Sequence, residues 1–481
     1  MAQHPNPAMG DSITDAPPSE QTKGGDLKMY DLPDSQNDIE SIKAIGDASG
    51  FDQQKAIEGH AHFHRLGWKR MTILLIVEAI ALGSLSLPSA FATLGMVAGV
   101  ILTVGLGLVA IYTSYIVGQV KLKYNDVHHY ADACGRILGR VGYEVVGVMF
   151  CLQLIFLVGS HCLTGTIAFQ TIVDKNVCSI IFGVVSAIIL LLLAIPPSFA
   201  DLAFLGYIDF VSILLAIGIT IIATGIKASD SDGGLASVPW SAWPKEGCTL
   251  VDAIVALTNI VFAYSFSITQ FSMMDEMSEP KDYVKSIWTL GTIEIVIYTI
   301  CGAVIYAFVG VDVKSPALLS AGPLVSKVAF GVGLPVIYIS GSINTTVVSR
   351  YLHRRMFANT VTQFINTPRG WTSWLILISV ITVIAFVIAE AIPFFNDLLS
   401  LSSALFVTGF TFYFPAMFWF MLIREGPWYS KQNIYKSIAN GIIFVIGIAI
   451  LIGGTYASIS DINSKFEDGT VKKAFSCGAV E

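Results

Sequence analysis

Residues 77–95 read VEAIALGSLSLPSAFATLG, an apolar stretch with small and polar residues near its centre. Gly83 and Pro88 both weaken a helix, because glycine is conformationally free and proline lacks the N–H of an interior turn. Proline also disfavours helical backbone at the residue before it, Leu87. The stretch therefore predicts a membrane-spanning helix that opens near its middle. Open backbone at membrane depth occurs only where protein or a water-filled cavity surrounds it.

A second stretch of the same kind, residues 256–277, reads ALTNIVFAYSFSITQFSMMDEM and places six polar side chains inside an apolar span. No glycine or proline marks it, so an interruption here is predicted from polarity alone. Discontinuous helices that meet near the middle of the membrane form the binding sites of many transporters. The two stretches together predict such a site.

The whole chain has the composition of a polytopic membrane protein. Of its 481 residues, 54% are hydrophobic and 13% are charged, whereas a soluble domain carries about 25% charged residues. Eleven segments are long and apolar enough to span a bilayer. They are 71–95, 97–120, 143–173, 178–195, 206–226, 251–274, 287–310, 326–349, 371–390, 398–422 and 437–459.

The spacing of the two interrupted spans predicts an internal repeat. The sixth span follows the first by five, an odd number, so the second half of the chain begins from the opposite side of the membrane. We therefore expect an all-α integral membrane protein in which spans 1–5 and 6–10 form an inverted repeat, with span 11 as an addition. The sequence similarity between the two halves is weak.

Charge predicts the orientation of the chain. The loops on the side of the N-terminus carry thirteen Lys and Arg residues and the opposite loops carry four, which places the N-terminus in the cytoplasm. Residues 1–60 hold 11 acidic and 4 basic residues, and the rest of the chain holds 24 of each. The charge excess therefore lies in the N-terminal tail, which excludes a basic groove for nucleic acid. The short connections leave no room for a soluble catalytic domain, so an enzyme is not expected.

These features divide the chain into four parts. Residues 1–56 are predicted to be a disordered, acidic cytoplasmic tail, because they contain few apolar residues. Residues 57–70 form a juxtamembrane segment, 71–459 the eleven-span transporter domain, and 460–481 an extracellular C-terminal tail. The tail lysines are candidate sites for ubiquitin-ligase adaptors that remove the protein from the cell surface; they are Lys23, Lys28, Lys43 and Lys55.

Three carboxyl groups within the spans are candidates for ion coupling, since charge inside a membrane is costly and marks ion pathways. Glu78 lies about 10 Å into the first span at 1.5 Å per residue. Asp209 and Glu294 lie near the cytoplasmic ends of their spans, where we expect water to reach them. The alternative for each is a structural carboxyl group bonded to a neighbouring helix.

A hydroxyl face in span 8 is a second candidate for ion coupling. Ser342, Thr345 and Thr346 occupy positions i, i+3 and i+4 of a helix, so their oxygens lie on one face. This face could ligate a cation against span 1, and it is the leading site if the coupling ion is sodium rather than a proton. The alternative is that the hydroxyl groups only join helices together.

Long strings of the sequence resemble the fungal neutral amino-acid permeases of the N-system type, in the amino acid/auxin permease family. Among them are residues 77–97 and 256–277, the string LLAIPPSFADLAFLGYIDFVSI at 192–213, and ISGSINTTVVSRYL at 339–352. The resemblance begins near residue 57 and continues to the end of the chain. It implies a LeuT-like fold and secondary active transport of neutral aliphatic and aromatic amino acids, driven by protons and without a cofactor.

The resemblance also implies where the substrate binds. Family contacts come from opened backbone in spans 1 and 6, which corresponds here to two groups of four residues: Gly83, Ser84, Leu85 and Ser86, and Phe262, Ala263, Tyr264 and Ser265. Free N–H groups at the start of a half-helix can hold a carboxylate, and free carbonyl groups can hold an ammonium group.

Two cysteines are predicted to lie on the outer side of the membrane. Cys178 follows span 3 and Cys248 precedes span 6, and disulfides persist in an oxidising space. We expect these two residues to pair and to tether the two outer loops. The alternative is two free thiols.

The sequence thus predicts a plasma-membrane proton symporter that takes up neutral amino acids. A vacuolar amino-acid exporter of the same fold and a transporter-like amino-acid sensor are the alternatives. A channel would show a continuous polar stripe along several spans, and the sequence shows two local breaks instead.

Overall fold

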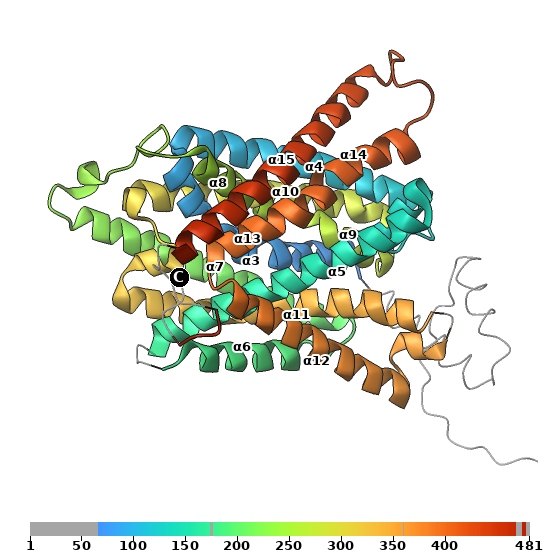
Figure 1. Ribbon diagram of the computed structural model, residues 1–481, viewed down its shortest axis with the longest axis horizontal. Helices are drawn as coiled ribbons and strands as arrows, with labels where there is room; N and C mark the ends of the chain where they lie inside the picture. The colour runs from blue at the N-terminus through green and yellow to red at the C-terminus, as the bar shows by residue number, and fades with distance from the viewer. Residues whose placement is uncertain (1–65, 174–176, 359, 468–473, 478–481) are drawn as a thin grey trace, which may run out of the picture.

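The computed structural model describes residues 66–173, 177–358, 360–467 and 474–477. Within these ranges the regular elements are helices, gathered in one bundle (Figure 1). The tail predicted to be cytoplasmic, most of the predicted juxtamembrane segment and the lysines predicted for ubiquitin attachment lie outside the described residues. Ten helical stretches of the described chain are long and apolar enough to cross a membrane.

The helices are labelled as in Figure 1, so that span 1 is α3 and span 6 is α8 with α9. The bounds are α3 (Trp68–Leu94), α4 (Met96–Lys123), α5 (Tyr130–Val173), α6 (Ser179–Leu193), α7 (Phe199–Ser229), α8 (Leu250–Ala263) with α9 (Ser267–Asp275), α10 (Tyr283–Val309), α11 (Pro323–Met356), α12 (Pro368–Ala391), α13 (Phe395–Ser402) with α14 (Phe414–Phe418), and α15 (Ile434–Glu467). Three π-helical segments, η6 (Ser403–Val407), η7 (Gly409–Tyr413) and η8 (Trp419–Ile423), complete the span that contains α13 and α14.

Each of the eleven predicted spans corresponds to a helix, to a helical pair or, for the tenth, to the consecutive helical segments from α13 to η8. The exception in length is α6, whose 15 residues extend only about 22 Å at 1.5 Å per residue, less than the ~30 Å hydrocarbon core. It packs against α5 and α12 at the edge of the bundle (Figure 1). The first turns of α5, from Tyr130, precede predicted span 3, and Gly139, at a φ of 63°, separates them from it.

The first span, α3, lies in the interior of the bundle and packs against α7, α8, α10 and α11 (Figure 1). Within its most apolar 18 residues, 94% are buried inside the protein. A helix that is apolar or small on every side has no face suited to water, and here neighbouring helices enclose it.

The predicted opening of span 1 is wrong, because α3 continues as a helix through Pro88. A proline leaves the carbonyl group four residues earlier without its helical donor. That carbonyl group belongs to Ser84, and it accepts a hydrogen bond from the thiol of Cys301 on α10 at 3.3 Å. The Ser86 hydroxyl group donates to the Gly83 carbonyl at 3.0 Å. The Cys301 thiol therefore takes the place of the missing backbone donor to Ser84.

The predicted interruption of span 6 is confirmed. The helix α8 ends at Ala263 and α9 begins at Ser267. Between them Tyr264 has φ −101° and ψ 39°, outside the helical region. Its side chain and those of its neighbours at 262–266 are buried, so the open backbone is surrounded by protein, as a bilayer requires.

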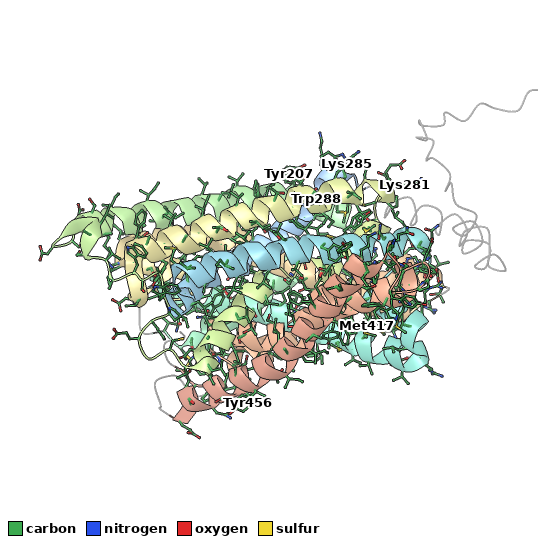
Figure 2. The ribbon with its side chains drawn as sticks, turned by 90° about the horizontal axis from the view of Figure 1, so that it is seen from above. Tyr207, Lys281, Lys285, Trp288, Met417 and Tyr456 are labelled. Atoms are coloured by element: carbon green, nitrogen blue, oxygen red, sulfur yellow. A yellow bond between two sulfur atoms is a disulfide. The ribbon has the colours of Figure 1, made fainter. Side chains whose placement is uncertain are left out.

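The loops predicted to be cytoplasmic gather at one end of the bundle, called the inner end here. Lys281 and Lys285 lie at this end, and Tyr456 on α15 lies toward the other, outer end (Figure 2). Backbone bonds also join both ends of span 1 to the segments that flank span 6. At the inner end the Leu66 N–H donates to the Glu276 carbonyl at 2.9 Å, and the Ser278 N–H donates to the Leu66 carbonyl at 3.1 Å.

At the outer end, the loop before α8 covers the corner between α3 and α4. The Lys245 N–H donates to the Thr93 carbonyl at 3.3 Å, and Met96 N–H donates to the Ser241 carbonyl at 3.0 Å. The corner itself is Gly95, whose φ of 79° and close approach to the Trp243 backbone leave no room for a side chain.

Candidate functional site

The break between α8 and α9 faces the middle of α3. A Cβ atom added to Gly83 would lie 2.9 Å from both the Cα and the Cβ of Ala263, so only glycine allows this approach of the two spans. The hydroxyl oxygen of Tyr298, on α10, lies 2.9 Å from the Ala263 carbonyl and 2.8 Å from the Ala79 carbonyl. It therefore shares its hydrogen between the last turn of α8 and the middle of α3.

The residues predicted on span 1 lie within intact helix rather than open backbone. The Ser84 hydroxyl group donates to the Ile80 carbonyl at 2.6 Å, and Leu85 and Ser86 are buried. Of this group the structure brings Gly83 against span 6, and it leaves the others within the continuous helix α3. Of the two predicted segments, only the one in span 6 therefore departs from helical backbone.

The residues predicted on span 6 form the break itself. Phe262 and Ala263 end α8, and the Tyr264 hydroxyl group donates to the Thr103 carbonyl of α4 at 2.8 Å. The Tyr264 ring meets the Tyr298 ring edge to face, with centroids 5.2 Å apart. The Ser265 carbonyl accepts the Ile268 N–H at 3.1 Å as α9 begins. The backbone of the break is thus positioned by two aromatic side chains, that of Tyr264 in the break and that of Tyr298 on α10.

Sequence reasoning missed Tyr298 and Cys301, which contact the carbonyl groups of both spans. Both lie on α10 with Glu294, at positions i, i+4 and i+7 of one helical face. A face of polar side chains in an otherwise apolar span was the available signal. A third missed residue, Thr411 of η7, donates to the Tyr264 carbonyl at 3.4 Å.

Glu78 joins span 1 to the second half of span 6. Its side chain is buried, with 5% exposure, and its Oε2 accepts a hydrogen bond from the hydroxyl group of Thr269 on α9. Asp209 and Glu294 are both 0% exposed. The expectation that water reaches them near the span ends is therefore wrong, because neighbouring helices cover both sites.

The hydroxyl face of α11 is buried and its hydrogens are used within the helix. Ser342 donates to the Ile339 carbonyl at 2.7 Å, and Thr345 and Thr346 donate to the carbonyl groups four residues earlier at 3.1 and 3.0 Å. The link from α11 to span 1 comes instead from Ser340, whose hydroxyl group donates to the Val77 carbonyl at 2.9 Å. The three predicted oxygens keep only acceptor capacity for a cation.

A charged network closes the inner end. The Asp275 carboxylate, at the end of α9, accepts bonds from Lys121 of α4 at 2.8 Å and from Arg354 of α11 at 3.0 Å, and it also contacts the His128 ring. The adjacent Glu276 pairs with Arg350 of α11. Burial, with the positive charge of Arg354, lowers the pKa of the neighbouring His129 well below its ordinary value, so that ring adds no positive charge to the network at neutral pH.

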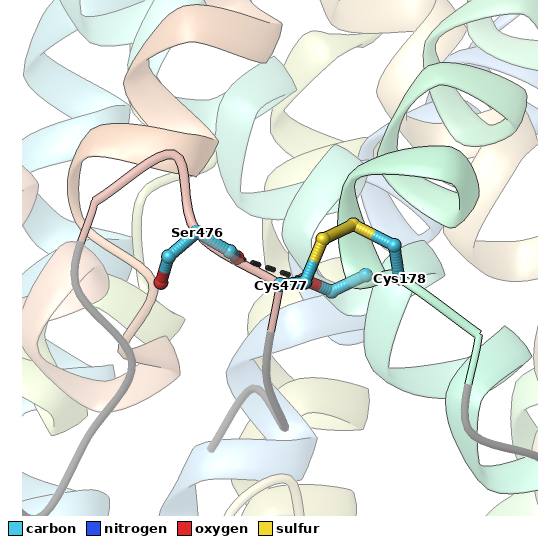
Figure 3. Close-up of a disulfide and its surroundings, with 4 residues drawn as sticks. Cys178, Ser476 and Cys477 are labelled. Atoms are coloured by element: carbon cyan, nitrogen blue, oxygen red, sulfur yellow. Dashed lines mark hydrogen bonds between the residues drawn. A yellow bond between two sulfur atoms is a disulfide. The ribbon is translucent and has the colours of Figure 1, made fainter.

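The predicted disulfide is wrong in one of its partners. Cys178 is bonded to Cys477, and Cys248 is a free thiol (Figure 3). The reason lies in the neighbours of each residue. Cys178 starts α6, which packs against α12, and the C-terminal segment follows that same edge, where the Phe475 N–H donates to the Glu390 carbonyl of α12 at 3.4 Å.

Thiol mapping tests this pairing and its side of the membrane together. Peptides from the oxidised protein are expected to contain Cys178 joined to Cys477, with Cys248 as a free thiol. A membrane-impermeant maleimide should label Cys248 in intact cells, and more readily as pH rises, because burial and the nearby Asp252 raise its pKa. A Cys178–Cys248 peptide, or labelling of Cys248 only after permeabilisation, would contradict the arrangement.

Known proteins resemble this chain in sequence along most of its length. Residues 64–460 match the family model described as transmembrane amino acid transporter protein. The chain is 59% identical to the N amino acid transport system protein of Neurospora crassa, over 96% of this chain and 99% of that protein. It is 24% identical to amino acid permease 2 of Arabidopsis thaliana, over 83% of this chain and 88% of that one.

A solved structure shows the same fold at low identity. A mutant of the manganese transporter from Eremococcus coleocola matches with a TM-score of 0.50 and 14% identity, over 84% of this chain and 95% of that one. The fold is therefore that of the LeuT-like transporters, and the family is one of transporters rather than enzymes. With a family match across the bundle and a relative 59% identical along nearly its whole length, the chain belongs to the transmembrane amino acid transporter family.

Proposed function

We propose that the protein is a proton symporter that carries neutral aliphatic and aromatic amino acids into the cell across the plasma membrane. The observation that carries the proposal is the bond between Glu78 of α3 and Thr269 of α9. It connects a group that can bind a proton to the half-helix that begins at the break. The name of the Neurospora relative, an amino acid transport system, supports the substrate class.

The substrate is expected to lie at the break, beside Gly83. The start of α9 is expected to offer N–H groups for the carboxylate. The Ala263 and Tyr264 carbonyl groups already accept from Tyr298 and Thr411, and each keeps a second lone pair for the ammonium group. The side chains nearest this backbone are Phe262, Tyr264 and Phe266, all buried. A lysine or glutamate substrate would bury a charge among aromatic rings without a partner, which costs several kcal/mol.

Uptake of a labelled amino-acid panel tests the proposal. Intact cells should accumulate leucine and phenylalanine when the outside is acidic, and dissipating the proton gradient should stop accumulation. Lysine and glutamate should compete at least about tenfold less well than leucine, because about 1.4 kcal/mol already corresponds to tenfold.

Other outcomes would point to the alternatives. Equal competition by lysine or glutamate would contradict the aromatic site. A requirement for sodium would make the face of Ser342, Thr345 and Thr346 the leading candidate for the coupling-ion site. Transport confined to isolated vacuoles would identify a vacuolar exporter, and binding without counterflow in proteoliposomes would identify a sensor.

A further inference from the structure

One face of α10 runs along the middle of α3. Tyr298 and Cys301 contact the Ala79 and Ser84 carbonyl groups of that span. Glu294 lies one turn before Tyr298 on the same face. It is 0% exposed, and neither carboxyl oxygen has a hydrogen-bond partner among the described residues. An unpartnered buried carboxyl group is costly unless it is protonated or binds a cation.

Glu78 directly precedes Ala79, whose carbonyl group accepts the Tyr298 hydrogen bond, so the α10 face that carries Glu294 packs on the part of α3 that carries Glu78. An electrostatic interaction between the two carboxyl groups agrees with this placement. Thr269 of α9 donates to Glu78, and Tyr298 follows Glu294 by one turn of α10. The helices α4 and α7 also pack on α10. In the described part of the chain, none of these elements places a cation beside the pair.

Two ionised carboxylates that interact inside a buried site repel each other, so one proton held by the pair is favoured over none. We propose that Glu294 is the second half of the coupling site and that Glu78 and Glu294 hold a single exchangeable proton. This inference rests on the proposed proton symport and names the residue that completes its site.

The proton step balances without another reactant. From the outer side, a hydronium ion loses a proton to one carboxylate of the pair, which forms an O–H bond and removes one negative charge. On the inner side, water takes the proton back and the charge returns. Tyr298 connects this step to the proposed substrate site, because it follows Glu294 by one turn and its hydroxyl group contacts the last carbonyl of α8.

The test compares variants of the full-length protein in proteoliposomes that contain a pH-sensitive dye. Wild type should move protons together with leucine in a fixed ratio. Glu294→Gln should lose gradient-driven accumulation and reduce the proton-to-leucine ratio to near zero, while leucine counterflow remains. The double variant with Glu78→Gln should be no more impaired than either single variant, since both remove the same proton site.

Two controls separate chemistry from folding. Glu294→Asp keeps a carboxyl group and should recover the proton-to-leucine ratio. Tyr298→Phe removes a hydrogen bond but keeps the pair, so it should slow uptake at an unchanged proton-to-leucine ratio.

In wild type, infrared difference spectra between acidic and neutral pH should show one protonated carboxyl band, which Glu294→Asp shifts. A spectrum without such a band would overturn the proposal even if Glu294→Gln fails to fold.

These measurements distinguish a failure of the proposed symport from a failure of the inference about Glu294. If wild type shows no proton dependence, the proposed symport and this inference both fail. If Glu78→Gln loses coupling and Glu294→Gln keeps the wild-type ratio, only the inference fails. Loss of coupling in Asp209→Asn with a wild-type ratio in Glu294→Gln would also overturn it, by placing the second carboxyl group on α7.

Discussion

Uptake of every substrate is expected to fall to background when Gly83 is replaced by valine. A Cβ at this position would lie 2.9 Å from the Ala263 backbone and 3.1 Å from the Tyr298 hydroxyl oxygen. Backbone cannot yield as a flexible side chain can, so the two spans must separate. Overpacking of this kind costs about 1–3 kcal/mol, and the displaced break would no longer present its carbonyl groups at one site.

The measurement is uptake of labelled leucine and phenylalanine, normalised to protein at the cell surface. Gly105 provides a matched control on α4, because a Cβ added there would meet nothing within 4 Å. Gly105→Val should transport like wild type. Selective loss of the larger substrate in Gly83→Val, with leucine retained, would mean that Gly83 lines a side-chain pocket and not the backbone contact.

Proton-driven accumulation is expected to disappear in Glu78→Gln. Glutamine has nearly the size of glutamate, and its carbonyl oxygen can still accept the Thr269 hydroxyl hydrogen. Its amide group, however, neither gains nor loses a proton at physiological pH. The internal leucine concentration should then equal the external one under an inward proton gradient, while exchange of internal for external leucine continues.

Thr269→Val is the matched control for this prediction, since it removes the hydrogen bond and keeps the carboxyl group. It should slow transport without changing the number of protons moved with each leucine. Unchanged proton dependence in Glu78→Gln would remove Glu78 from the mechanism and, with it, the proposed coupling site.

The positions of the spans could be predicted because a bilayer imposes length and polarity on every segment that crosses it. The break at Tyr264 was visible for the same reason, since six polar side chains rarely share one apolar span. The continuity of α3 through Pro88 could not be predicted. The donor that replaces the proline N–H is the thiol of Cys301, more than 200 residues later in the sequence, and a local sequence pattern contains no information about such a contact.

The candidate site was predictable in part for a similar reason. Hydropathy identifies Glu78 as costly, but depth along a span does not reveal which neighbours cover a residue. Glu294 and Asp209 were therefore placed near water, whereas other helices enclose them. The partner of Cys178 depended on the path of the C-terminal segment beside α12, and loop position alone could not distinguish Cys477 from Cys248.

The ion pairs at the inner end bear on how this end can open. Asp275 and Glu276, which follow the second half of span 6, pair with Arg354 and Arg350 of α11. Backbone bonds from Leu66 to Glu276 and Ser278 attach the start of span 1 to the same segment. A path for water between this segment and α11 would therefore have to separate two pairs of opposite charges. Such a separation is costly in a dry interior and costs much less once water hydrates both signs.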